Sequence, residues 1–127
     1  MHETLDHFLG GRLQLFQPVE GYRAGIDPLF LSASLHPKSG EKILDIGAGS
    51  GIASLALALR CKTVTVTGLE IQQELVDLAS RNRQINHLIE RVDIIQGDIL
   101  TPPSPLLPHT FDQVMTNPPF YLSLIHI

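Results

Sequence analysis

The sequence predicts an α/β fold in which helices cover a parallel sheet, a Rossmann-like arrangement. Two observations predict it. From Glu41 onward, short apolar stretches alternate with stretches of helical periodicity, and a glycine-rich loop joins the first of these strands to the first helix. Strands that alternate with helices pair in parallel through right-handed crossovers, so we expect one parallel sheet in this part of the chain.

Residues 1–40 differ from the rest and predict one strand and one helix. The stretch RLQLFQP, over 12–18, alternates apolar and polar residues after a glycine turn, which indicates a short strand. A helix should follow, because Asp27 is suited to the N-cap and Pro28 to the first helical position. Pro37 should end this helix.

Residues 41–121 supply the alternating strands and helices. The crossover before the last strand contains four prolines, so it should be an irregular loop, because proline cannot continue a helix. The predicted strands are 42–46, 63–70, 91–98 and 111–117, and the predicted helices are 51–60 and 72–86.

Composition limits the class of protein. With 127 residues and 43% hydrophobic content, the chain is long enough for one domain with a buried core. It has no apolar run that could span a bilayer and no secretory leader, so we expect a cytoplasmic protein. We also expect a monomer. The single cysteine, Cys61, excludes an internal disulfide and fits a reducing compartment as a small buried residue.

Charge and histidine spacing restrict the ligands. A net charge of −4 gives no electrostatic support for binding to a phosphate backbone. The six histidines lack the spacing of metal ligands, so we expect no metal site.

The loop LDIGAGSG, over 44–51, is a candidate ligand site. Its glycines follow a strand and open a helix, where backbone can approach a ligand closely. The dinucleotide fingerprint would need a further glycine where this chain has Ile52. Asp45, directly before the loop, would repel a pyrophosphate and attract an α-ammonium group. The pattern therefore favours a cofactor that carries an amino acid over NAD.

Two more acids end the next predicted strands. Glu70 lies at the separation from the glycine loop at which a carboxylate meets ribose hydroxyls in nucleotide-binding α/β folds. Asp98 follows the third strand and could accept a hydrogen bond from an adenine amine. Ligands of open α/β sheets bind at the carboxyl ends of the strands, so these acids should line one site.

Four motifs now resemble a known family. ILDIGAGSG, GLEIQ, GDI and NPPF, in this order, resemble the class I S-adenosylmethionine (SAM) dependent methyltransferases, and NPPF is similar to the motif of members that methylate planar amines. The stretch FLGGRLQLFQPVEGYRAGIDPLFLSA resembles the bacterial family that methylates the exocyclic N6 amine of an adenine in the anticodon loop of valine tRNA. The resemblance extends from Asp6 to Phe120. It implies SAM as cofactor and tRNA as substrate.

The resemblance also implies roles for individual residues. Asp45 and the glycine loop would hold the methionine part of SAM, and Glu70 the ribose. Ile71 would pack against the adenine ring, with Asp98 and Ile99 at its edge, and Arg23, Gly25 and Asp27 would line the entrance. The implied cofactor residues are Arg23, Gly25, Asp27, Asp45, Gly47, Ala48, Gly49, Gly51, Glu70, Ile71, Asp98, Ile99 and Asn117.

The NPPF motif would carry the chemistry through Asn117, Pro118, Pro119 and Phe120. The lone pair of an adenine amine is delocalised into the ring, so the enzyme must favour a more tetrahedral nitrogen. The Asn117 side-chain oxygen and the Pro118 carbonyl would accept its two N–H groups, and the prolines would hold that carbonyl rigidly. Phe120 would stack against the flipped target base.

Other readings stay open at this point. The substrate could be the N2 amine of guanine in ribosomal RNA or a glutamine amide of a release factor. The methyltransferases that act on glutamine more usually carry tyrosine where this chain has Phe120, which favours a nucleic acid as the substrate. A SAM-binding module without activity is a third reading, which the intact Asn117 disfavours.

The end of the sequence carries its own expectation. The family has a seven-stranded sheet, and this chain supplies the strands as far as the one before NPPF, so we expect an incomplete sheet of four strands and a fragment that is inactive by itself. LSLIHI, over 122–127, matches the translation of a transposon-derived sequencing adapter. We therefore expect the natural sequence to end at about Tyr121 in this chain, an authentic apolar ending being the alternative.

Overall fold

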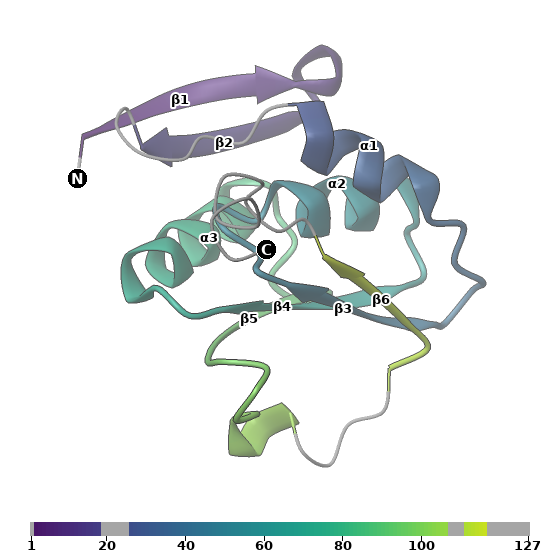
Figure 1. Ribbon diagram of the computed structural model, residues 1–127. Coiled ribbons are helices and arrows are strands. Elements are labelled where there is room, and N and C mark those ends of the chain that lie inside the picture. Colours follow the sequence, from purple (N-terminus) through teal and green to yellow (C-terminus); the bar gives the residue numbers. More distant parts are fainter. Residues whose placement is uncertain (1, 19–25, 107–110, 117–127) are drawn as a thin grey trace.

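The computed structural model describes residues 2–18, 26–106 and 111–116, which form a hairpin, a parallel sheet and helices between them (Figure 1). No helix among these residues is long and apolar enough to cross a membrane. In chain order the elements are β1 (Glu3–Phe8), η1 (Leu9–Gly11), β2 (Leu13–Pro18), α1 (Ile26–Ser34), β3 (Lys42–Ile46), α2 (Ile52–Arg60), β4 (Thr65–Glu70), α3 (Gln73–Ile85), β5 (Val92–Gln96), η2 (Ser104–Leu106) and β6 (Gln113–Thr116).

The four strands β3 to β6 form the predicted parallel sheet. Their order is β5-β4-β3-β6, and every neighbouring pair is parallel. The strand before the glycine loop, β3, therefore lies inside the sheet, with β4 on one side and β6 on the other. This order brings the carboxyl ends of three consecutive strands, β3, β4 and β5, to one edge, as the sequence predicts.

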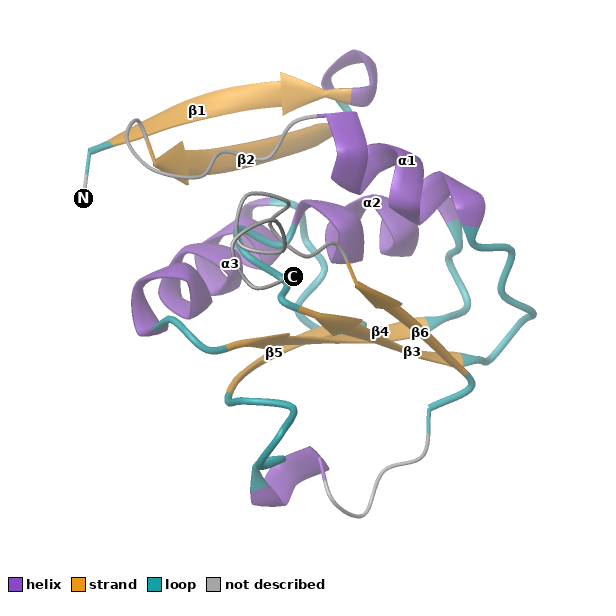
Figure 2. Ribbon diagram, viewed as in Figure 1, coloured by secondary structure: helices purple, strands orange, loops and turns teal. Residues whose placement is uncertain are grey.

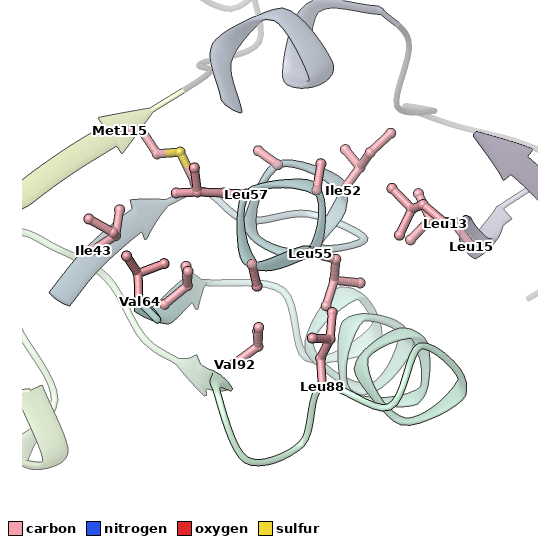
Figure 3. Packing of buried hydrophobic residues seen from close by; sticks show 14 residues of the cluster. Leu13, Leu15, Ile43, Ile52, Leu55, Leu57, Val64, Leu88, Val92 and Met115 are labelled. Carbon is pink, nitrogen blue, oxygen red and sulfur yellow. The ribbon is translucent and has the colours of Figure 1, made fainter. Parts of the chain in front are cut away.

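Helix α2 is the centre of the main core because it is apolar on every side. All of its residues from Ile52 to Ala58 are buried. One side contacts the sheet, and the opposite side contacts Leu13 and Leu15 of β2, which are fully buried (Figure 3). Such a helix must be enclosed on all sides, and the hairpin of β1 and β2 closes the side that faces away from the sheet (Figure 2).

The other face of the sheet has a smaller core. Leu44 and Leu69 pack there with Leu106, which is part of the crossover between β5 and β6. The predicted irregular loop is confirmed for its described part, whose only helical element is the three-residue turn η2. Figure 1 shows the described part of this crossover below the sheet, on the side away from α1, α2 and α3.

The hairpin contains one strand that the sequence did not predict. β1 pairs antiparallel with β2 over their full lengths, from Glu3 opposite Pro18 to Phe8 opposite Leu13. The pattern ETLDHF carries few apolar residues, so it gives little signal for a strand. β1 is held by backbone pairing with β2, which becomes visible only in three dimensions.

Three details differ from the sequence prediction. Helix α1 begins at Ile26, so Asp27 lies in its first turn and is not the N-cap, although an acid there still favours the helix dipole. On α3 the apolar spacing predicts Leu75, Leu78, Ala79 and Ile85 as inward positions. Leu78 and Ala79 are buried, but Leu75 and Ile85 are only half-buried, and Val76 and Asn82 are buried as well. Cys61 is half-buried at the end of α2, packed against the core, rather than fully buried.

Candidate cofactor site

The glycine loop lies at the carboxyl edge of the sheet and is held by the neighbouring strand. Gly47, Gly49 and Gly51 have φ of 75°, 59° and 92°, a left-handed backbone that strains residues with a Cβ atom. The amides of Gly47 and Ala48 both donate to the carbonyl of Leu69, at 2.8 and 3.0 Å. The end of β4 therefore fixes the turn that leads into α2.

Glu70 joins this loop to the start of α3. Its side chain is 6% exposed. Its Oε1 accepts a hydrogen bond of 2.9 Å from the amide of Gly49, and its Oε2 accepts one of the same length from the amide of Gln72. Each carboxylate oxygen has room for a second donor, so this anchored carboxylate can also accept from hydroxyl groups of a ligand.

Asp45 lies beneath the loop, at the end of β3. It is 2% exposed, and the Ser54 hydroxyl in α2 donates a hydrogen bond of 2.6 Å to its Oδ2. Burial raises the pKa of Asp45 to about 7; the bond from Ser54 opposes this rise, and the nearby Glu70 carboxylate adds to it. A cation bound close to Asp45 would favour its ionised form.

Gly68 is a site residue that sequence reasoning missed. It is the register partner of Asp45 in the sheet. A Cβ atom built on Gly68 would lie 2.9 Å from the Ala48 Cβ, 3.0 Å from the Ile94 Cδ1 and 3.4 Å from the Ser54 Oγ. The glycine loop and Ser54 can therefore approach β4 because this position carries no side chain. A lone glycine in a predicted strand was the available signal.

A hollow of about 170 Å³ opens at this edge. It is lined by residues of β3 and β4, the glycine loop, and the segment after β5. Two of its described lining residues are acidic and none is basic. The site residues predicted from the sequence that it brings together are Gly47, Glu70, Ile71, Asp98 and Ile99.

The side chains around the hollow are both polar and apolar. Ile71 and Ile99 are 59% and 39% exposed, so each presents apolar surface toward solvent at the site. The amide of Gly97 donates to the Glu70 carbonyl at 3.0 Å, and the Oδ1 of Asp98 accepts a bond of 3.0 Å from the amide of Leu100. The end of β5 is thus tied to the end of β4 with Asp98 held beside it.

Some predicted residues are not part of this arrangement. Arg23, Gly25 and the NPPF residues Asn117, Pro118, Pro119 and Phe120 lie outside the described residues. Asp27 is exposed on α1 and does not line the hollow. In the described part of the chain, no group of three or more His, Cys, Asp or Glu side chains is placed to hold a metal ion.

β6 ends beside this site. Its last residue, Thr116, is the register partner of Ile46, which directly precedes the glycine loop. The predicted catalytic motif follows Thr116 in the sequence.

A family model described as methyltransferase small domain matches residues 26–124. The rRNA N(6)-adenosine-methyltransferase metl-5 of Caenorhabditis elegans is 38% identical over 81 residues, 64% of this chain and 38% of that protein. The tRNA1(Val) (adenine(37)-N6)-methyltransferase of Glaesserella parasuis serovar 5 (strain SH0165) is 30% identical over 99 residues, 78% of this chain and 41% of that protein.

A third relative acts on a protein, according to its name. The release factor glutamine methyltransferase of Aliivibrio fischeri (strain ATCC 700601 / ES114) is 40% identical over 80 residues, 63% of this chain and 27% of that protein. The chain thus spans between about a quarter and two fifths of the length of these three relatives.

Solved structures share the fold. A predicted O-methyltransferase, Atu636, from Agrobacterium tumefaciens superposes with a TM-score of 0.65 at 26% identity, over 76% of this chain and 50% of that one. A SAM-dependent methyltransferase from Thiobacillus denitrificans, solved with S-adenosyl-L-homocysteine, superposes with a TM-score of 0.50 at 28% identity, over 56% of this chain and 28% of that one. The predicted Rossmann-like methyltransferase fold is confirmed.

Proposed function

The chain belongs to the methyltransferase small domain family, and we propose that it binds SAM in the hollow at the carboxyl edge of β3, β4 and β5. The reaction we propose is methyl transfer to the exocyclic N6 amine of an adenine in tRNA, in the cytoplasm. The observation that carries the proposal is Glu70, whose carboxylate is fixed between the glycine loop and α3 while it lines the hollow.

The charges of the hollow fit SAM better than a dinucleotide. Glu70 and Asp98 line it without a basic partner among the described lining residues. Such a surface accepts hydrogen bonds from ribose hydroxyls and attracts a cation, whereas it repels a pyrophosphate. The sulfonium and α-ammonium groups of SAM are cations, so the chemistry of these side chains suits it.

Each part of the site then has a role toward SAM. Glu70 would accept from the ribose hydroxyls, and Ile71 and Ile99 would cover the faces of the adenine. Asp45, below the loop, would stabilise the α-ammonium group. Gly51, the N-cap of α2, provides no side-chain cap, and the Ser54 amide is bonded to Asp45, so the first-turn amides before Ser54 would face the carboxylate of the methionine part.

The bound cofactor would supply an electrophilic methyl group, and the protein would orient the amine. We infer from the sequence that Asn117 and the Pro118 carbonyl accept the two N–H groups of the adenine amine, which directs its lone pair toward the methyl group. As the bond from nitrogen to the methyl group forms, the bond from the methyl group to sulfur would break and S-adenosylhomocysteine would leave. The cationic amine would lose its proton readily to water, so no strong base would be required. Orientation of two bound reactants can supply roughly 7–11 kcal/mol of the rate acceleration.

Cofactor binding is tested by calorimetry on the full-length protein that contains this chain. Glu70→Ala should weaken SAM binding by about 1–3 kcal/mol, because donors in the loop and on the ligand lose their acceptor. Glu74→Ala, an exposed acid in the first turn of α3, is the matched control and should bind SAM normally. NAD should not bind, and equal affinity for NAD and SAM would contradict the proposal.

The substrate is tested by nucleoside analysis of cells with and without the gene. We expect N6-methyladenosine to disappear from tRNA in the deletion strain. The relatives also include an rRNA adenosine methyltransferase and a release factor glutamine methyltransferase, so rRNA nucleosides and release factor peptides belong in the same experiment. Loss of a methyl group from rRNA or from a glutamine, with tRNA unchanged, would move the assignment to that substrate.

A further inference from the structure

A second, larger hollow lies on the opposite side of α2 from the sheet. It has a volume of about 620 Å³ and is enclosed by the η1 turn, by α1 and by the carboxyl end of α2. We call it the basic groove. Leu9, Leu29 and Leu59 contribute apolar surface to it, and Arg12, Arg60 and Lys62 contribute its charges.

The charge of the basic groove is opposite to that of the whole chain. The chain has thirteen acidic and nine basic residues. Three of the nine basic residues line this one groove, and none of its described lining residues is acidic. Nearby helix carboxyl ends contribute roughly half a negative charge each, which leaves the groove with net positive charge.

Two of the three cations are fixed by backbone carbonyls. The Nη2 of Arg60 donates to the carbonyls of Ser32 and Leu35, at the end of α1, and the Nε of Arg12 donates to the carbonyl of Leu9 at 3.2 Å. Each of these bonds uses one nitrogen of its guanidinium. Arginine presents five N–H groups in a planar fork, so both groups retain donors that could bind an anion.

The turn that forms one wall of the groove has an unusual backbone. Leu9 has φ of 53°, which is left-handed and strained for a leucine, and the glycines at 10 and 11 continue the left-handed path. Strain of this kind persists where the surrounding structure fixes it and is often found at ligand sites. Here the strained residue is Leu9, whose side chain supplies the apolar surface of the turn in the groove. Its carbonyl accepts the hydrogen bond from Arg12.

We propose that the basic groove binds the sugar-phosphate backbone of the RNA substrate, an inference that rests on the proposed function. Fixed guanidinium groups and a lysine suit phosphates, and the aliphatic surface between them suits ribose. Helix α2 leads from the glycine loop to the groove, and its nine residues span about 13 Å. Nucleotides that flank the target base could therefore occupy the groove while the base lies at the cofactor edge.

The experiment measures the salt dependence of RNA binding by the full-length protein. The probe is a fluorescein-labelled anticodon stem-loop of valine tRNA, followed by anisotropy over a series of KCl concentrations. Lys62→Gln and Arg12→Gln should each weaken binding and lower the slope of log K against log salt by about 0.7, the value for one phosphate contact with a single strand.

Two controls match these variants. Lys42→Gln removes an exposed positive charge from the start of β3, outside the groove, and should keep the wild-type slope. Arg12→Lys retains the charge of the groove but alters the bond to Leu9, and should also keep the slope. All variants should bind SAM like the wild type, because none of these side chains lines the cofactor hollow.

Three outcomes would overturn the proposal. If all variants bind RNA and the slopes are equal for Lys62→Gln, Arg12→Gln and Lys42→Gln, the groove does not bind the RNA backbone. The proposed function would then still stand. Absence of RNA binding by the wild type would refute both. Groove-dependent binding of a poly-glutamate peptide, with RNA binding unchanged in the groove variants, would assign the surface to an acidic protein instead.

Discussion

The side-chain amide of Asn82, in α3, donates a hydrogen bond of 2.9 Å to the backbone carbonyl of Ser50 in the glycine loop. The same amide group donates to the carbonyl of Phe16 at 3.0 Å, and its Oδ1 accepts from the amide of Phe16 at 2.7 Å. Asn82 is fully buried. One side chain therefore joins the N-terminal hairpin, α3 and the proposed cofactor loop.

Asn86, the C-cap residue of α3, one turn after Asn82, repeats only half of this arrangement. Its Oδ1 accepts from the amide of Gln14 at 3.0 Å, and its Nδ2 donates to the carbonyl of the same residue at 2.6 Å. The two asparagines thus bind the free edge of β2 as a neighbouring strand would. Asn86 differs from Asn82 in that its side chain bonds to Gln14 and to the Asn82 carbonyl instead of the glycine loop, so the two residues can be compared directly.

We expect Asn82→Ala to weaken SAM binding and Asn86→Ala to leave it unchanged. Asn82→Ala removes partners from buried backbone groups of Phe16 and Ser50, which costs about 1–3 kcal/mol for each group left unsatisfied. Both variants should unfold at lower urea concentration than the wild type, because both loosen the hairpin. Calorimetry with SAM separates them, and an equal loss of affinity in both would show that Asn82 has no special effect on the loop.

The stability of the protein should depend on the ionisation of Asp45. Its pKa is raised to about 7 in the folded state by burial, from 3.8, so the folded state binds a proton more tightly than the unfolded state. The stability that the raised pKa of Asp45 gives to the folded state is therefore fully present below about pH 4. It is lost as the pH rises to about 7 and above.

The test is urea unfolding of the wild type and Asp45→Asn between pH 4 and pH 8. Asn keeps an oxygen that can accept from Ser54 and cannot ionise. The difference in free energy of unfolding between the two proteins should shift in favour of Asp45→Asn as the pH rises. A difference that stays constant across this range would mean that folding does not raise the pKa of Asp45.

Gly68→Ala should disturb the glycine loop from the adjacent strand. The added Cβ would lie 2.9 Å from the Ala48 Cβ, and overpacking of this kind costs about 1–3 kcal/mol. We expect lower stability together with weaker SAM binding. The double variant Gly68→Ala, Ala48→Gly removes the contact and should recover part of the SAM affinity. Wild-type SAM affinity in the single variant would show that the loop adapts without loss.

Asn117→Ala separates chemistry from cofactor binding. If its side chain orients the target amine, turnover should fall by roughly 10²–10³ while SAM affinity changes by no more than a few-fold. Thr116→Ala, at the preceding exposed position, serves as the control and should retain turnover. Single-turnover methyl transfer to tRNA measures the difference. Full turnover by Asn117→Ala would contradict the proposed orienting role.

The sequence predicted the parts of the fold that depend on local patterns. KILDI was predicted as a strand over 42–46 and is β3 with the same bounds. Glu70 and Asp98 were assigned to one site from the rule that parallel strands end at a common edge, and both line the hollow. These predictions needed only periodicity and the order of the elements.

What the sequence did not predict depends on contacts between distant residues. β1 forms a strand because it pairs with β2. In the sequence Asn82 is an ordinary polar residue, and its role becomes visible only in the structure, where it bonds to β2 and to the glycine loop. In the same way, the space above Gly68 is occupied by Ala48, twenty positions earlier in the chain. No periodicity within a short window contains such information.

The position of β6 beside β3 has a consequence for synthesis on the ribosome. The residues that join these strands are far apart: Lys42 and Asp112, which exchange hydrogen bonds of 2.8 Å at the start of the two strands, are separated by 70 positions. At 5–20 residues per second, roughly 4–14 s pass between the translation of these two positions. During this interval one side of β3 has no native partner, so the nascent chain exposes a strand edge that other chains could bind. Among the four described strands of the parallel sheet, the pairing of β3 with β6 is thus the last to form during synthesis.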